Sequence, residues 1–104
     1  MDVDLSKLEG FEWDGGNQSK SLKKHGITAL ETEEVFFNFY LVFPDQRHSL
    51  VEPRYGMHGK TNAGKVLFIV FTIRGLRVRI ISARLASKKE RNTYEETFKK
   101  IAKI

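Results

Sequence analysis

The chain has 104 residues, enough for one domain with a single hydrophobic core. Its apolar content of 40% is typical of a folded domain, and the absence of cysteine excludes disulfides and thiolate chemistry. The acidic start MDVDLSKLEG is unlike a signal peptide, and the longest apolar run, 66–73, is too short to span a bilayer. We therefore expect one soluble, cytoplasmic domain over residues 1–104, without membrane association.

Charge is distributed unevenly along the chain. Residues 1–50 contain nine acids and five bases, a net charge of −4, whereas residues 51–104 contain four acids and thirteen bases, a net charge of +9. The stretch 74–91, RGLRVRIISARLASKKER, contains seven Arg and Lys residues and one Glu. Because a planar guanidinium can donate two hydrogen bonds to one anion, this pattern predicts a polyanionic partner. Basic charge kept only for solubility is the alternative.

The first third of the chain predicts a short strand and two helices. Residues 11–13 form an aromatic strand, and Asp14 caps a helix over about 17–24 that ends at Gly26. The sequence TALE is a capping box that opens a second helix over about 28–38.

The remaining residues predict a sheet and a last helix. The strands are expected at 40–43, 54–60, 65–73 and 77–83. The third of these, KVLFIVFTI, is apolar on both faces, which is typical of a central strand. The sequence SKKE is a second capping box and starts the final helix, on which Tyr94, Phe98 and Ile101 form a core-facing stripe. The predicted fold is α+β, with a mostly antiparallel sheet of four to five strands, two N-terminal helices and one C-terminal helix.

Alternation along the strand 77–83 divides its cations between two faces. Arg77 and Arg79 share one face with Ala83, whereas Arg84 at the end of the strand has the opposite parity. His48 and Glu52, in a polar loop over 46–53, could join a site beside these cations or only solvate the turn.

Several catalytic classes lack the residues that they need. The three histidines have no partner at metal-ligand spacing, the glycines lie in separate turns, and no nucleophile elbow is present. We therefore expect no metal site and no cofactor. Cleavage of RNA without metal remains, since it needs a base, an acid and cations that stabilise the charge developing at phosphorus.

Four segments, in order, resemble the BrnT family, the toxin halves of bacterial type II toxin–antitoxin pairs. They are FEWD, LKKHGIT, PDQRHS with EPRY, and RVRIISARLASKKERNTYEE. The likeness spans about residues 11–96 and implies a RelE-like ribonuclease that arrests translation by cutting RNA. It also implies neutralisation by a BrnA-like antitoxin of the ribbon–helix–helix class, with promoter DNA bound only through the antitoxin complex.

The resemblance and the chemistry together mark candidate site residues. Arg79, Arg84 and Arg91 would bind and stabilise the scissile phosphate, and His25 would transfer a proton. Further cations that we expect to contact RNA are Lys24, Arg54, Arg77 and Lys88. Ordinary structural roles are also open, because Arg84 could pair with Glu90 or another acid of the last helix, and His25 could stabilise the end of the first helix.

Two other functions stay open. In the family pattern a Lys and an Asn precede the histidine of the first helix, and here Asn17 and Ser21 occupy those positions. The chain could therefore be a degenerate toxin that keeps only its antitoxin-binding surface. It could also be a non-catalytic basic module that binds RNA, DNA or a protein partner.

Overall fold

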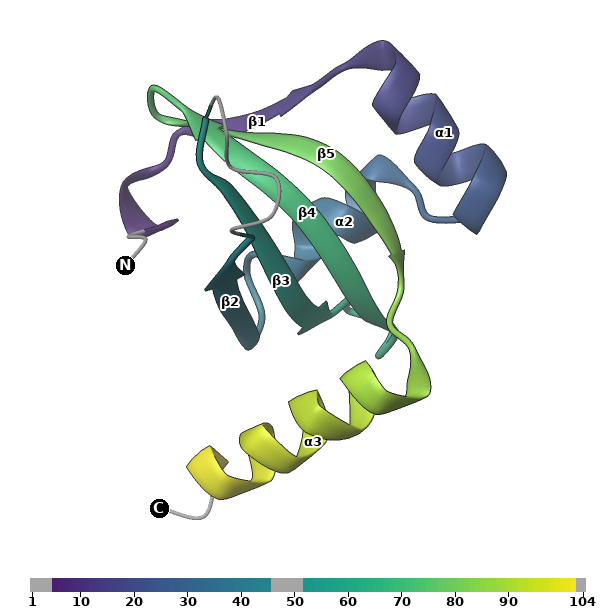
Figure 1. Cartoon of the computed structure of the whole chain (residues 1–104), viewed down its shortest axis with the longest axis vertical. Coiled ribbons are helices and arrows are strands. Elements are labelled where there is room, and N and C mark those ends of the chain that lie inside the picture. The colour runs from purple at the N-terminus through teal and green to yellow at the C-terminus, as the bar shows by residue number, and fades with distance from the viewer. Residues whose placement is uncertain (1–4, 46–51, 103–104) are drawn as a thin grey trace.

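The computed structural model describes residues 5–45 and 52–102, which form a five-stranded sheet and three α-helices (Figure 1). In chain order, after a 3₁₀ turn at Leu5–Lys7, the elements are β1 (Gly10–Trp13), α1 (Gly15–His25), α2 (Ala29–Val35), β2 (Tyr40–Pro44), β3 (Arg54–Lys60), β4 (Val66–Arg74), β5 (Arg77–Leu85) and α3 (Lys88–Ala102). The predicted α+β class and its order of elements are confirmed. His48 and most of the predicted polar loop lie outside the described residues.

The sheet has the strand order β1-β5-β4-β3-β2. Strands β2 to β5 form an antiparallel meander, and β1 pairs in parallel with β5. Strand β4 is central, as its apolar sequence predicted. Its connection to β5 is a two-residue turn in which Gly75 has a φ of 59°, a left-handed conformation that favours glycine.

The predicted helix caps are present. Asp14 accepts a hydrogen bond from the Gly16 backbone N at 2.8 Å, and α1 begins two residues before its predicted start. The helix ends at Gly26, whose φ is 69°. Reciprocal capping boxes open the other two helices, at Thr28 with Glu31 for α2 and at Ser87 with Glu90 for α3.

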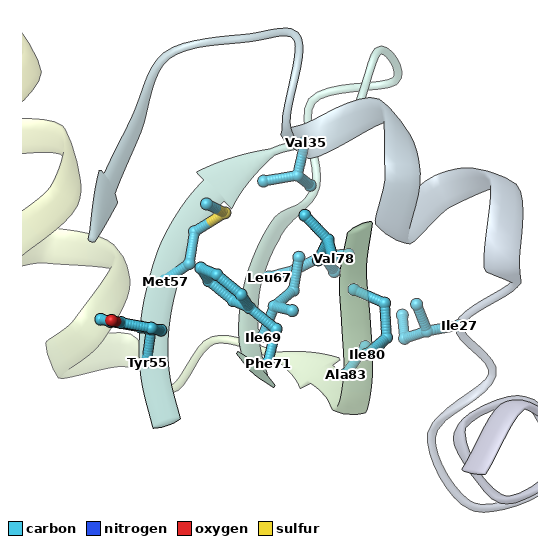
Figure 2. Packing of buried hydrophobic residues seen from close by; sticks show 10 residues of the cluster. All are labelled: Ile27, Val35, Tyr55, Met57, Leu67, Ile69, Phe71, Val78, Ile80 and Ala83. Atoms are coloured by element: carbon cyan, nitrogen blue, oxygen red, sulfur yellow. The ribbon is translucent and has the colours of Figure 1, made fainter. Parts of the chain in front are cut away.

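One face of the sheet is covered by α2 and by the segment that joins α1 to α2, while α1 packs beside β5 (Figure 1). The buried side chains on this covered face include Ile27, Val35, Met57, Leu67, Ile69, Phe71, Val78, Ile80 and Ala83 (Figure 2). Strands β3, β4 and β5 supply the buried layer, and β1 and β2 add partly buried side chains at its margin, so this layer fixes the strand register on which the opposite face depends.

Helix α3 lies across one end of the sheet (Figure 1). Tyr94 is 1% exposed, and its hydroxyl donates a hydrogen bond to the Phe39 carbonyl oxygen at 2.8 Å. The predicted core-facing stripe is otherwise wrong, since Phe98 and Ile101 are 41% and 50% exposed. The helix extends past the edge of the sheet, so its second half has little to pack against. We call the sheet face opposite α2 the basic face; α3 reaches only one end of it.

Candidate functional site

The strand register places a set of polar and aromatic side chains on the basic face. Cross-strand partners point to the same side of a sheet, so each set of paired residues forms a row. One row contains Arg54, Thr72 and Arg79, and the other contains His58, Phe68 and Arg84. The predicted candidates Arg54, Arg79 and Arg84 are therefore on one surface.

A β-bulge brings Arg84 to this surface. Val70 of β4 pairs with Ser82 of β5, but Phe71 pairs with Ile80, so Ile81 is an extra residue in β5. The predicted opposite parity of Arg79 and Arg84 is therefore wrong, because the extra residue reverses the alternation between them. The same shift puts Ala83 on the covered face, where it is fully buried.

Arg84 forms a bidentate ion pair with Glu90 in the first turn of α3. Its two terminal nitrogens lie 2.9 Å and 3.0 Å from the two carboxylate oxygens of Glu90. The guanidinium carbon is 4.4 Å from the centroid of the Phe68 ring, a cation–π contact. The hydrogen bonds from Arg84, and a further one from the Ser87 backbone N, hold the pKa of Glu90 at about 2. The pairing that the sequence left open for Arg84 is thus formed, and phosphate binding at Arg84 remains a prediction.

His58 lies beside this ion pair. Its Nε2 is 3.7 Å from Glu90 Oε2, and its ring is 5.1 Å from the Phe43 ring and 5.4 Å from the Phe68 ring, centroid to centroid. Burial lowers the pKa of His58, as does Arg84, and Glu90 only partly offsets this. His58 is consequently a neutral imidazole near pH 7 that can accept a proton.

His58 is not among the site residues predicted from the sequence, because it has no partner at metal-ligand spacing and lies outside the segments that marked His25 and His48. A usable signal was present. Arg54, His58 and Lys60 alternate along β3 and therefore share one face of that strand.

Gly56 provides the space for two stacked aromatic rings, Phe43 and Phe68, on the basic face. It pairs with Phe43 of β2 and with Val70 of β4. A Cβ at Gly56 would lie 2.3 Å from Phe43 Cε2, so only glycine lets this ring lie flat across β3. The Phe43 ring then stacks against Phe68 at a centroid distance of 6.2 Å. The Phe43 ring therefore lies next to the row that contains His58 and Arg84.

Three arginines gather at the other end of the basic face. Arg79 Nη2 lies 3.6 Å from Asp14 Oδ2, and Arg74 Nη2 lies 3.2 Å from Glu52 Oε1. The hydrogen bond from Arg74 lowers the pKa of Glu52, and the charges of Arg74, Arg54 and Arg79 lower it further. Glu12 of β1, the cross-strand partner of Arg79, and Asp14 also lie at this end, so these arginines are held among carboxylates that orient them.

The other predicted site residues are exposed and lie apart from the two rows. Lys24 and His25 are in the last turn of α1, and within the described ranges the His25 side chain makes no hydrogen bond or ion pair. Arg77 pairs with Arg74 beside the β4–β5 turn and shares the basic face with Arg79, as alternation predicted, whereas Lys88 and Arg91 are on the exposed side of α3. Within the described ranges, no hydrogen bond or ion pair joins His25 to Arg79 or Arg84, and its role in proton transfer remains a prediction.

Residues 5–45 and 52–102 hold no group of three or more His, Asp or Glu side chains placed to bind a metal ion. They also contain no helix that is long and apolar enough to cross a membrane.

Comparisons with known proteins agree with one another. Residues 13–90 match the family model described as the ribonuclease toxin BrnT of type II toxin–antitoxin systems. The fold is similar to the crystal structure of the Brucella abortus ribonuclease toxin BrnT, with a TM-score of 0.62, 26% sequence identity, and coverage of 76% of this chain and 97% of that chain. No curated protein matches the sequence. Both rows of the basic face lie inside the matched residues.

Proposed function

This chain belongs to the BrnT family of ribonuclease toxins of type II toxin–antitoxin systems, and we propose that it is an endoribonuclease that cuts RNA without a metal ion. The observation that carries this proposal is the placement of Arg54, Arg79 and Arg84 on one sheet face, which depends on the bulge at Ile81. Arginines can supply the electrostatic stabilisation of a phosphorane that other ribonucleases obtain from metal ions.

RNA would lie along the basic face and contact both rows. Phe68 and Thr72 are four residues apart on β4, so the rows are separated by about 13 Å along the strand. This spacing suits separate phosphates of one RNA strand, one for each of Arg54, Arg79 and Arg84, better than a single phosphate. The exposed ring of Phe43 between the rows offers a surface for base stacking, and the exposed cations Lys24, Arg77, Lys88 and Arg91 would add to the attraction for RNA.

The family also carries expectations about regulation. As the toxin of a type II pair, the protein would arrest translation in the cytoplasm. A BrnA-like ribbon–helix–helix antitoxin would neutralise it, and promoter DNA would be bound only through the complex of the two. Co-expression with the protein encoded in the adjacent reading frame tests this, since a cognate antitoxin should restore growth and co-purify with the toxin.

Cleavage itself is tested with purified protein and RNA in the presence of EDTA. We expect cutting by the unmodified protein, and a loss of at least about 100-fold in rate for Arg84→Ala, as for removal of a donor to a developing oxyanion. Lys99→Ala, in the exposed last turn of α3, is the control and should cut normally. Unchanged cutting by a folded Arg84→Ala protein would refute the role of Arg84.

A degenerate toxin that only binds its partners is the second candidate. It is favoured by the ion pairs of Arg84 with Glu90 and of Arg79 with Asp14, which occupy the two arginines most suited to phosphate. Ser21, at a position where the family has Asn, is 3% exposed and is poorly placed to contact substrate. Expression without the antitoxin separates the candidates, because an active toxin stops growth. Salt-sensitive RNA binding without cutting would favour the binder.

A further inference from the structure

We infer that His58 is the general base of the proposed ribonuclease, and that the carboxylate of Glu90 occupies the position that the scissile phosphate takes when RNA binds. This inference rests on the proposed function and adds to it the residue that removes the proton. It replaces His25, which the sequence favoured, with a histidine that lies beside Arg84.

The position of Glu90 resembles that of a bound phosphodiester. Its two oxygens accept parallel hydrogen bonds from the two terminal nitrogens of Arg84, at 2.9 Å and 3.0 Å. Two non-bridging phosphate oxygens can accept the same pair of bonds, since the arginine fork matches both anions. One of the Glu90 oxygens also lies 3.7 Å from His58 Nε2. An anion held by Arg84 in this way is therefore next to the imidazole.

His58 Nε2 has no hydrogen-bond partner among the described residues, although it is buried. Most buried polar atoms of folded proteins are hydrogen-bonded, so such an atom needs an explanation. The 3.7 Å separation from Glu90 is too long for a hydrogen bond. Phe43 and Phe68 fix the plane of the ring. A ligand that displaces Glu90 would give this nitrogen its missing partner.

Exchange of Glu90 for a phosphodiester conserves the charge of the site. Each group carries one negative charge, so Arg84 stays paired throughout. Glu90 is in the first turn of α3 and also accepts a hydrogen bond from the Ser87 backbone N at 2.7 Å. The same oxygen, Oε1, accepts from Arg84 Nη1, so a Glu90 that rotates away from Arg84 also releases this bond, and water can replace it at the exposed start of the helix. The exchange therefore requires a side-chain movement and no rearrangement of the helix.

The reaction then follows from the neighbours of the phosphate. His58 Nε2 takes the proton of the ribose 2′-hydroxyl, and the 2′-oxygen attacks phosphorus. The bond from phosphorus to the 5′-oxygen breaks, and this oxygen takes a proton from water. The products are a 2′,3′-cyclic phosphate and a 5′-hydroxyl, and the imidazolium returns its proton to the solvent. Arg84 stabilises the charge on the non-bridging oxygens during the transfer.

The surroundings of His58 suit a base. Among the described residues, the charged groups that face it are Glu90 of α3 and Arg84 of β5, while β2 and β4 present Phe43 and Phe68. Burial and Arg84 lower the pKa of His58 below its usual 6.5, which leaves the ring unprotonated at neutral pH. Cleavage by such a base should decline only on the acidic side of this value.

The first experiment compares the pH dependence of RNA cleavage by the unmodified protein, His58→Gln and His25→Gln. We expect His58→Gln to lower kcat by about 10²- to 10⁴-fold with little change in KM, and to lose the decline at acidic pH. A decline that persists in His58→Gln, or that disappears in His25→Gln instead, overturns the inference. Failure of the unmodified protein to cut RNA would contradict the proposed function itself, whereas normal cutting by His58→Gln would contradict only the role of His58.

The second experiment measures binding of a 2′-O-methyl RNA oligonucleotide, which cannot be cut because its 2′-oxygens are blocked. Glu90→Gln keeps an acceptor for the α3 cap but loses the charge that competes for Arg84. We expect it to bind roughly threefold to tenfold more tightly than the unmodified protein. Ser87→Ala is the matched control, since it weakens the same cap and leaves the Arg84–Glu90 pair in place. Binding of Glu90→Gln no tighter than that of Ser87→Ala overturns the exchange, whether or not His58→Gln folds.

Discussion

Gly56 lies between Phe43 of β2 and Val70 of β4, and a Cβ there would meet the Phe43 ring at 2.3 Å. We expect Gly56→Ala to displace this ring and to lower the free energy of unfolding by about 1–3 kcal/mol, as overpacking does. Chemical denaturation measures the effect. Gly10→Ala in β1 is the control, since no atom lies within 4 Å of its added Cβ and its stability should change little. Equal stabilities for the two variants would contradict the close contact at Gly56.

The lowered pKa of Glu90 predicts how the free energy of unfolding depends on pH. Its pKa is about 2 in the folded protein against a usual 4.5, so the ionised form stabilises the fold. This stabilisation is complete above pH 4.5 and is lost as the pH falls through about 2. We expect the difference in unfolding free energy between the unmodified protein and Glu90→Gln to shrink over this range. Urea denaturation at a series of pH values tests this, and a constant difference would contradict it.

At the scale of single residues, the sequence indicated which residue types could form a site, but it did not show which side chains lie next to one another in the fold. It marked Arg79 and Arg84 by their density in a basic strand, and both lie on the basic face. It could not show that Arg84 pairs with Glu90, because several acids of α3 were equally compatible with the spacing. The alternation of Arg54, His58 and Lys60 along β3 places His58 on the face of Arg54, but it does not show that Arg84 and Glu90 of other elements lie beside it.

At the scale of elements, local signals predicted well and a long-range one did not. The caps at Asp14, Thr28 and Ser87 are each satisfied by residues within three positions, so the sequence alone predicts them. The bulge at Ile81 is different. The bulge arises from the pairing of β5 with β4. Ile80 and Ala83 are three residues apart and are both buried on the covered face, which requires one extra residue between them. Strict alternation of side chains therefore assigned Arg84 to the wrong face.

The bulge makes a prediction about β5 as a unit. Deletion of Ile81 would restore regular alternation, and Arg84 would then point into the covered face or the end of β5 would detach. We expect a loss of about 3–5 kcal/mol in unfolding free energy, the cost of an uncompensated buried charge. Ile81→Ala keeps the extra residue and should cost less, about 1–2 kcal/mol. Thermal and urea denaturation compare the two, and equal stabilities would show that the register does not depend on the extra residue.

Over the whole molecule, acids of the N-terminal half and cations of the C-terminal half meet on the basic face. The N-terminal half has a net charge of −4 and the C-terminal half +9. Both halves contribute to the basic face, since Asp14 approaches Arg79 while β3, β4 and β5 supply the arginines. Acids of the first half therefore orient cations of the second without neutralising all of them. Binding of RNA should for this reason be strongly electrostatic.

The dependence of RNA binding on salt measures this directly. Each phosphate neutralised on a single strand contributes about −0.7 to the slope of log K against log salt, so contacts from Arg54, Arg79 and Arg84 predict a slope of about −2. Titrations of a 2′-O-methyl oligonucleotide at several salt concentrations give the slope.

Arg54→Ala should reduce the magnitude of this slope by about 0.7, because the variant loses one phosphate contact at the end of the face remote from His58. Lys99→Ala should leave the slope unchanged. A slope near zero, or one insensitive to Arg54→Ala, would mean that RNA does not lie across both rows, since a strand bound at the His58–Arg84 row alone would never reach Arg54.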